Sequence, residues 1–270
     1  MIMDNKDLVH EPMVEEFWRQ FFTEGPPIEK VRRNRFYRFL PAENRCKWCL
    51  ATFDGVSGAI AKTIFQTYPS RYNPHYWNVC DDFSNKYQGG AEIPLTILFA
   101  DIRGSSKLAE KIGLKEFSEL INRFFIKSTH VLTGFGAMIE KLVGDEVTAI
   151  FSRGLSGENY PGQAIEAAKK LLRETGHGDE KRAWVQVGIG IHSGEAFIGS
   201  VGKPNGIMEV AALGDVPNTA ARLTSLAGPG EILVSEHTIK AAGLDTGGLE
   251  KRQLKLKGHE KEITAYILHA

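Results

Sequence analysis

Hydrophobic residues repeat at helical spacing within residues 11–24, near the start of the chain. The apolar side chains of this stripe are Met13, Phe17 and Phe21, with the neighbouring Trp18 and Phe22. Pro26 and Pro27 follow and are expected to end the helix, because proline lacks the amide hydrogen that a helix needs. We expect the helix to pack on its own domain or on a second subunit.

Periodicity is weak between residues 28 and 90, where arginine, aromatic residues and turn formers are frequent. We expect this segment to be irregular, with YQGG at 87–90 as a linker. The predicted organisation is an N-terminal extension over residues 1–90, made of a helix and a cysteine-containing irregular segment, followed by one larger domain over residues 91–270.

Short apolar runs alternate with amphipathic stretches from residue 94 onward. The predicted strands are 94–101, 137–143, 146–151, a pair within 183–202 that turns at Ser193-Gly194, 208–213, 231–236, 254–258 and 262–268. The predicted helices are 105–136 with a break at Gly113, 160–178, 216–227 and a short one after the strand at 231–236. Hairpins mixed with helices predict an α+β fold, with a largely antiparallel sheet covered by helices.

Composition narrows the class of protein. The chain has 270 residues, and its 33 Lys and Arg balance its 33 Asp and Glu. A formal charge of zero argues against a general binder of nucleic acid or of membrane surfaces, since both usually need a basic excess. The N-terminus has no continuous apolar segment, and no stretch approaches the roughly 18 apolar residues of a membrane span. Three cysteines fit a reducing compartment, so we expect a cytoplasmic protein.

The segment FADIRGSS at 99–106 carries the first candidate chemistry. Asp101 ends an apolar strand, and Gly104 with two serines begins a helix. This arrangement can hold a hard cation beside backbone N–H groups that favour phosphate. The alternative is that Asp101 only caps the helix.

A second acid, Asp145, lies in the predicted hairpin KLVGDEV. Two carboxylates at neighbouring strand ends can bridge a pair of divalent cations, as in-line phosphoryl chemistry requires. The alternative for Gly144-Asp145 is a simple tight turn.

Four segments together resemble the catalytic domain of class III nucleotidyl cyclases, the adenylate/guanylate cyclase family. They are LTILFADIRGSSKLAEK, IEKLVGDEVTAIF, VGIGIHSGEAFIGSVG and ALGDVPNTAARLTSLAGPGEILVSE, and the resemblance runs from about residue 93 to the end. It implies a ferredoxin-like sandwich. It also implies conversion of a nucleoside triphosphate to its 3′,5′-cyclic monophosphate and pyrophosphate, in a homodimer whose two sites each combine both subunits.

The resemblance also implies roles for single residues. Asp101, Asp145 and the Ile102 carbonyl match the ligands of two Mg²⁺ or Mn²⁺ ions. Asn218 matches the residue that orients the ribose, and Arg222 matches the one that stabilises charge on the α-phosphate. Without the resemblance, Arg222 would be taken for a solvated helix cation. Further substrate contacts are expected at Phe99, Arg103, Gly104, Ser105 and Ser106.

The base is the point at which the sequence departs from the family. Lys141 matches the lysine with which adenylate cyclases read a ring nitrogen, whereas guanylate cyclases have glutamate there. The partner position, which accepts from the exocyclic amine, is Ala211. Because Lys141 can donate a hydrogen bond and Ala211 cannot accept one, the pair favours a base that presents a carbonyl oxygen at this edge. We therefore expect UTP, as in compact cyclases of bacterial anti-phage signalling that make cyclic UMP or cyclic CMP. ATP or CTP is the alternative.

Two further features stay open in the sequence. His259 occupies the register of the family's phosphate-contacting lysine, and the flanking Lys257 and Lys261 are both candidates for that contact. In the extension a zinc knuckle is incomplete, because Trp77 stands at its third cysteine position. The ligand set for a structural Zn²⁺ would be Cys46, Cys49, His75 and Cys80, and the alternative is a group of buried thiols.

A catalytically dead, cyclase-like regulatory module is the competing hypothesis. A dead copy usually loses a metal-binding acid or the Asn/Arg pair. Here Asp101, Asp145, Asn218 and Arg222 are all present, which favours an enzyme.

Overall fold

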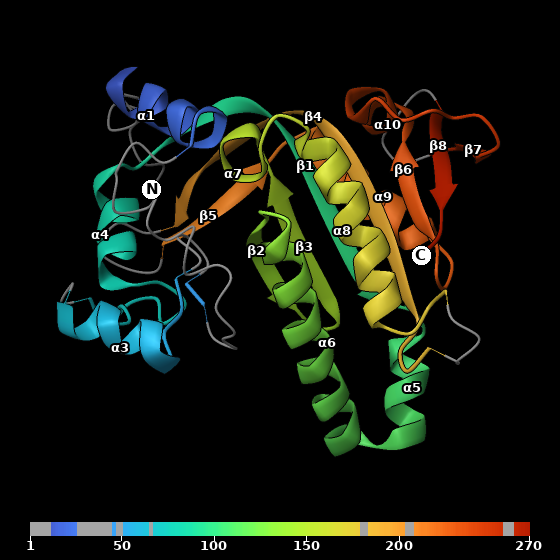
Figure 1. Ribbon diagram of the computed structural model, residues 1–270, viewed down its shortest axis with the longest axis horizontal. Helices are drawn as coiled ribbons and strands as arrows, with labels where there is room; N and C mark the ends of the chain where they lie inside the picture. The colour runs from blue at the N-terminus through green and yellow to red at the C-terminus, as the bar shows by residue number, and fades with distance from the viewer. Residues whose placement is uncertain are drawn as a thin grey trace, which may run out of the picture.

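The computed structural model of the chain is built around one large sheet (Figure 1). It describes residues 12–25, 45–46, 51–64, 67–178, 183–202, 208–255 and 262–270. Within these residues the strands are β1 Gly90–Ile102, β2 Met138–Val143, β3 Glu146–Phe151, β4 Val187–Gly202, β5 Met208–Leu213, β6 Ile232–Ser235, β7 Glu250–Leu254 and β8 Ile263–Leu268.

The sheet has the order β2-β3-β1-β4-β6-β8-β7, and β5 pairs with the end of β4. Only the β4–β6 pairing is parallel among these described strands. The prediction of an α+β fold with a largely antiparallel sheet is confirmed.

One face of the sheet is covered by helices that follow the predicted pattern. They are α6 Leu114–Gly134, α8 Tyr160–Glu174 and α10 Glu236–Ala242, with the short α7 Arg153–Ser156 nearby. The helix α5 Ser105–Ile112 packs against α6 at the end of the sheet rather than on its face. Leu98, Ala100 and Ile102 of β1 face this side and pack with Phe124 of α6 and Leu171 of α8. The predicted break at Gly113 is confirmed: its φ of 86° is one that glycine adopts readily and other residues rarely do.

The opposite face carries α9 Asp215–Leu226 and the N-terminal region. Ile93, Leu95 and Ile97 of β1 alternate with the residues above and join a second apolar cluster. In that cluster they meet Val216 and Ala220 of α9. The N-terminal contributors are Trp18, Phe21 and Phe22 of α1 Pro12–Thr23, and Cys46, Ala51, Phe53, Tyr76, Trp77 and Cys80.

Two expectations for the N-terminal region were wrong. Met13 does not pack with the stripe, because its side chain is 75% exposed at the first turn of α1. The segment 28–90 is not irregular throughout, since it contains α3 Gly55–Ile64 and α4 Asn78–Lys86. YQGG runs directly into β1, with Gly90 already paired to Gly199.

The predicted turn at Ser193-Gly194 was also wrong. β4 is one continuous strand, and both residues pair with β1, opposite Thr96 and Leu95. The glycine has another use there, because a methyl group at Gly194 would lie 2.9 Å from Cγ2 of Val216 on α9. Glycine in this strand lets the helix approach the sheet closely.

No helix in the described part of the chain is both long and apolar enough to cross a lipid bilayer.

Candidate active site

The two candidate metal-binding acids meet at the end of β1. Ile97, Phe99 and Asp101 are two residues apart along β1, so their side chains lie on the same face of the sheet, the one that α9 covers. Its partner across the β1–β3 ladder is Glu146, the residue after Asp145. The amide of Ile102 donates a hydrogen bond of 3.3 Å to the carbonyl oxygen of Asp145. The Gly144-Asp145 turn is thereby joined to β1.

Negative charge is concentrated at this corner. Burial raises the pKa of Asp101, the charge of Asp145 raises it further, and Arg103 opposes both effects. Burial likewise raises the pKa of Glu146, with Asp101 and Asp145 adding to the shift. Crowded carboxylates of this kind are stabilised by a cation. The carboxylate and carbonyl oxygens present are the donors that Mg²⁺ and Mn²⁺ prefer, so the residues fit a divalent-metal site.

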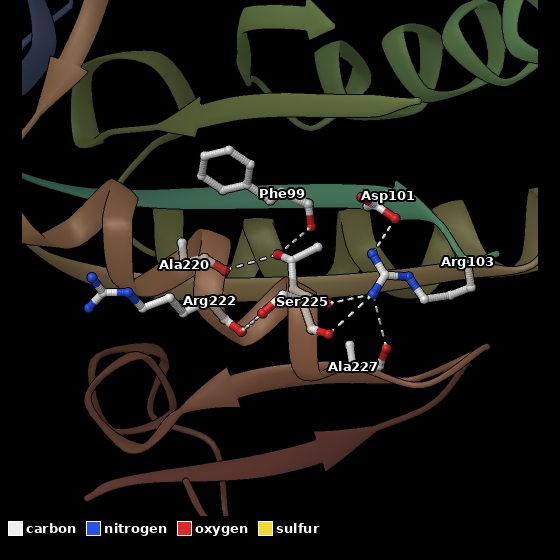
Figure 2. A network of polar contacts seen from close by, with 8 residues as sticks. Phe99, Asp101, Arg103, Ala220, Arg222, Ser225 and Ala227 are labelled. Atoms are coloured by element: carbon white, nitrogen blue, oxygen red, sulfur yellow. Dashed lines mark hydrogen bonds and ion pairs between the residues drawn. The ribbon is translucent and has the colours of Figure 1, made fainter. Parts of the chain in front are cut away.

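Arg103 links this corner to the C-terminal end of α9 (Figure 2). Its guanidinium forms an ion pair with Asp101 through Nη2. Nη1 donates to the carbonyl oxygens of Thr224 at 3.1 Å, Ser225 at 3.4 Å and Ala227 at 3.5 Å. Cations at a helix C-terminus satisfy its last carbonyls. The guanidinium expected to contact substrate is therefore engaged with the protein, and its substrate role stays a prediction.

The remaining residues of the first motif surround this link. The Phe99 side chain is partly buried against the second apolar cluster, and its carbonyl accepts from Oγ1 of Thr224 at 3.4 Å. Gly104 precedes α5 with a φ of 70° and forms no side-chain cap. Ser105 is half-buried and Ser106 exposed at the start of that helix. The phosphate contacts expected of these residues stay predictions.

Asn218 and Arg222 lie one turn apart on α9. Asn218 is exposed and Arg222 partly exposed, so both side chains are accessible from outside the subunit. Figure 2 shows the Arg222 guanidinium directed away from Asp101 and Arg103, at the other side of the helix. The single chain therefore does not bring Arg222 to the corner that carries Asp101 and Asp145.

The two candidate base-reading positions lie on different strands. Lys141 is on β2 with its side chain 48% exposed, and Ala211 is buried on β5, where it pairs with Gly199. Glu140 links the two strands: its Oε1 lies 3.6 Å from Nζ of Lys141 and accepts a 3.2 Å hydrogen bond from the amide of Ala212.

Glu140 was not among the residues selected from the sequence. Burial raises its pKa, and the charge of Lys141 and the Ala212 amide oppose that shift. An acid beside the candidate lysine was the only available signal. In a regular strand it would point to the opposite face from Lys141 and attract no interest.

Three predicted residues, Cys49, Lys257 and Lys261, lie outside the described residues, as does His259. Of the remaining zinc candidates, Cys46 and Cys80 are buried, and the Cys46 sulfur accepts from the Trp77 amide at 3.5 Å. Within the described ranges, no three His, Cys, Asp or Glu side chains are grouped to hold a metal ion. The ligand set expected for Zn²⁺ includes Cys49, so that site stays a prediction.

Comparison with known proteins identifies the larger part of the chain. The family described as "Adenylate and Guanylate cyclase catalytic domain" matches residues 91–270. A terminal-differentiation-specific adenylate cyclase of Dictyostelium discoideum is 30% identical over 194 residues, covering 67% of this chain and 9% of the relative. An adenylate cyclase of Anabaena cylindrica is 26% identical over 190 residues, covering 65% of this chain and 37% of the relative.

The fold has matching solved structures. The crystal structure of the guanylyl cyclase Cya2 superimposes with a TM-score of 0.59 at 27% identity, covering 66% of this chain and 93% of that one. The chain thus matches nearly all of that structure but well under half of the two curated relatives. This agreement supports the expected sandwich of the cyclase catalytic domain.

Proposed function

The chain belongs to the family of adenylate and guanylate cyclase catalytic domains, and from that premise we propose that it is a nucleotidyl cyclase. It would convert a nucleoside triphosphate to its 3′,5′-cyclic monophosphate and pyrophosphate, with residues 91–270 as the catalytic unit. The observation that carries the proposal is the corner at the end of β1, where the Asp145 turn is hydrogen-bonded to β1 beside Asp101, and where burial, with the nearby charge of Asp145, raises the pKa of Asp101.

The reaction balances without a further reactant. The ribose 3′-oxygen attacks the α-phosphorus and loses its proton, and the bond from that phosphorus to the pyrophosphate oxygen breaks. Two divalent cations, held by Asp101, Asp145 and the Ile102 carbonyl, would acidify the 3′-hydroxyl and neutralise the triphosphate. Asn218 would orient the ribose, and Arg222 would donate to the α-phosphate as negative charge develops.

The direction of Arg222 supports a homodimer with composite sites. Since its guanidinium points away from Asp101 of the same chain, the two would meet only across an interface. A two-fold axis would then pair Asp101 of each subunit with Arg222 of the other, giving two equivalent sites.

The base is the finer part of the proposal. Ala211 offers no side-chain acceptor, which favoured UTP and, with it, a role in anti-phage signalling. Adenylate cyclase activity is the second candidate, and one observation favours it: the buried carboxylate of Glu140 lies beside Lys141 and β5.

The test is incubation of the purified protein with ATP, CTP, GTP or UTP and Mn²⁺, followed by separation of the cyclic products. We expect one or more 3′,5′-cyclic nucleotides and equimolar pyrophosphate. Asp101→Asn keeps the size of the side chain but removes its charge, and we expect at least a roughly 100-fold loss of turnover. Glu195→Gln, at an exposed carboxylate of β4, is the matched control and should keep full activity. Absence of product from all four nucleotides, or full activity of Asp101→Asn, would contradict the proposal.

A further inference from the structure

A β-bulge places two consecutive residues of β2 on the same face of the sheet. Ile139 pairs with Ala149 and Lys141 pairs with Thr148, so Glu140 is an extra residue without a partner in the ladder. Ile139 and Leu142 both pack into the core beneath α6 and α8. Glu140 and Lys141, between them, therefore both point to the opposite face, the one that carries Asp101 and α9.

The Glu140 carboxylate lies where a base-reading acceptor is needed. Its side chain is only 3% exposed, and Oε1 is held by the Ala212 amide, directly beside Ala211. Oε1 also faces the Lys141 ammonium. Among the described residues, all the polar contacts found for this carboxylate involve Oε1, which leaves Oε2 available to a ligand.

We propose that Glu140 is a specificity-determining residue, which accepts a hydrogen bond from the exocyclic amine of the substrate base while Lys141 donates to the adjacent ring nitrogen. The inference rests on the proposed cyclase function and names its substrate class: a nucleoside triphosphate whose base is adenine or cytosine. The bulge supplies from β2 the acceptor that Ala211 on β5 lacks.

The order of the two groups decides between bases. The carboxylate is fixed to β5, and the ammonium is half-exposed farther along β2. Adenine and cytosine each have an exocyclic amine next to a ring nitrogen that accepts a hydrogen bond. The amine can donate to the Glu140 carboxylate while the ring nitrogen accepts from the Lys141 ammonium. Uracil and guanine have a carbonyl next to a ring N–H. The carbonyl oxygen would face the Glu140 carboxylate, acceptor against acceptor, and the ring N–H would face the Lys141 ammonium, donor against donor. The site therefore disfavours UTP, reversing the preference drawn from Ala211 alone.

The test compares kcat/KM for ATP, CTP, UTP and GTP in wild type, Glu140→Gln and Glu140→Asp, with Glu195→Gln as the control. We expect wild type to prefer ATP or CTP over both UTP and GTP. Glu140→Gln should reduce that preference by about 10-fold or more, because an amide can either donate or accept. Glu140→Asp keeps the carboxylate and should keep the sign of the preference. Glu195→Gln should leave every ratio unchanged.

The readout is a ratio between substrates in one preparation, so a general loss of folded protein cancels. A wild-type preference for UTP or GTP would overturn the inference, as would an unchanged ratio in Glu140→Gln. If no nucleotide is turned over, the proposed function fails instead. Equilibrium binding of the same four nucleotides then decides the inference: a preference for amine-bearing bases that Glu140→Gln loses supports it, and any other pattern overturns it.

Discussion

Glycines of β4 determine how closely α9 approaches the sheet. A methyl group at Gly190 would lie 2.3 Å from the amide nitrogen of Thr224 and 2.5 Å from the carbonyl oxygen of Ala220. At Gly188 it would lie 2.9 Å from the Ala227 carbonyl and 3.1 Å from the Arg103 side chain. These neighbours are mostly backbone atoms of α9 or of the residue after it, so the helix itself would have to move. Asn218 and Arg222 would move with it.

Gly190→Ala is therefore expected to lower the free energy of unfolding by about 1–3 kcal/mol through overpacking. It should also lower kcat, because the helix that carries Asn218 and Arg222, the proposed catalytic pair, is displaced. Gly134→Ala is the matched control, since Gly134 is exposed in α6 with open space around its Cα. That change should leave stability equal or slightly higher, because alanine favours helix over glycine. Urea unfolding with activity measurements checks both, and equal stability of the two variants would refute the packing argument.

At the residue scale, sequence reasoning succeeded where local pattern determines position. Asp101 and Asp145 were expected together because a strand end and a hairpin turn fix them, and the structure joins them. The prediction of a turn failed at Gly194, where the glycine lets α9 pack closely on the sheet. Sequence reasoning also missed Glu140, because a bulge depends on how two strands pair and leaves no periodic signal in the chain.

At the scale of elements, β5 depends on side chains from elsewhere in the chain. It pairs with β4 along one edge, and backbone groups of Met208, Val210 and Ala212 are hydrogen-bonded to side chains from other elements. The amide of Val210 donates to the hydroxyl of Tyr76 at 3.2 Å, and Nδ2 of Asn73 donates to the carbonyl of Met208 at 3.1 Å. The N-terminal region and Glu140 together therefore cover the edge of the strand that carries Ala211.

Tyr76→Phe tests this support. The buried amide of Val210 would lose its partner, and we expect the free energy of unfolding to fall by about 1–3 kcal/mol. Tyr72→Phe is the control, because Tyr72 is 58% exposed. Chemical denaturation of the two variants beside wild type measures the difference. If both variants unfold at the same denaturant concentration as wild type, the hydroxyl does not stabilise β5.

The elements that sequence reasoning missed have two different physical causes. α6, α8 and α9 have apolar residues at helical spacing because each rests on the sheet along one side. α3 and α4 have only 10 and 9 residues and lie in a segment rich in aromatic residues and turn formers, so their periodicity was not apparent. The continuous β4 was divided because Ser193-Gly194 resembles turn chemistry, while its pairing with β1 is a long-range property.

At the scale of the whole molecule, the two halves of the proposed active site lie in one chain but do not meet there. Asp101 lies at the end of β1, and the Arg222 guanidinium extends from α9 in the other direction (Figure 2). Arg103 connects the two by holding Asp101 and the end of α9 at once. In a two-fold dimer each subunit would thus contribute to both sites, and this physical link would join them.

The most direct test of this account is complementation between two inactive variants. Asp101→Asn retains Arg222, and Arg222→Ala retains Asp101, so a mixed dimer has one complete site and one site lacking both groups. Each variant alone should be inactive. Co-expressed with different tags in equal amounts, they should recover about one quarter of the wild-type activity per subunit, since about half of the dimers are mixed and each has one working site. We predict that cyclase activity is found in the fraction purified through both tags, which contains the mixed dimer. A mixed dimer as inactive as either variant alone would contradict the account.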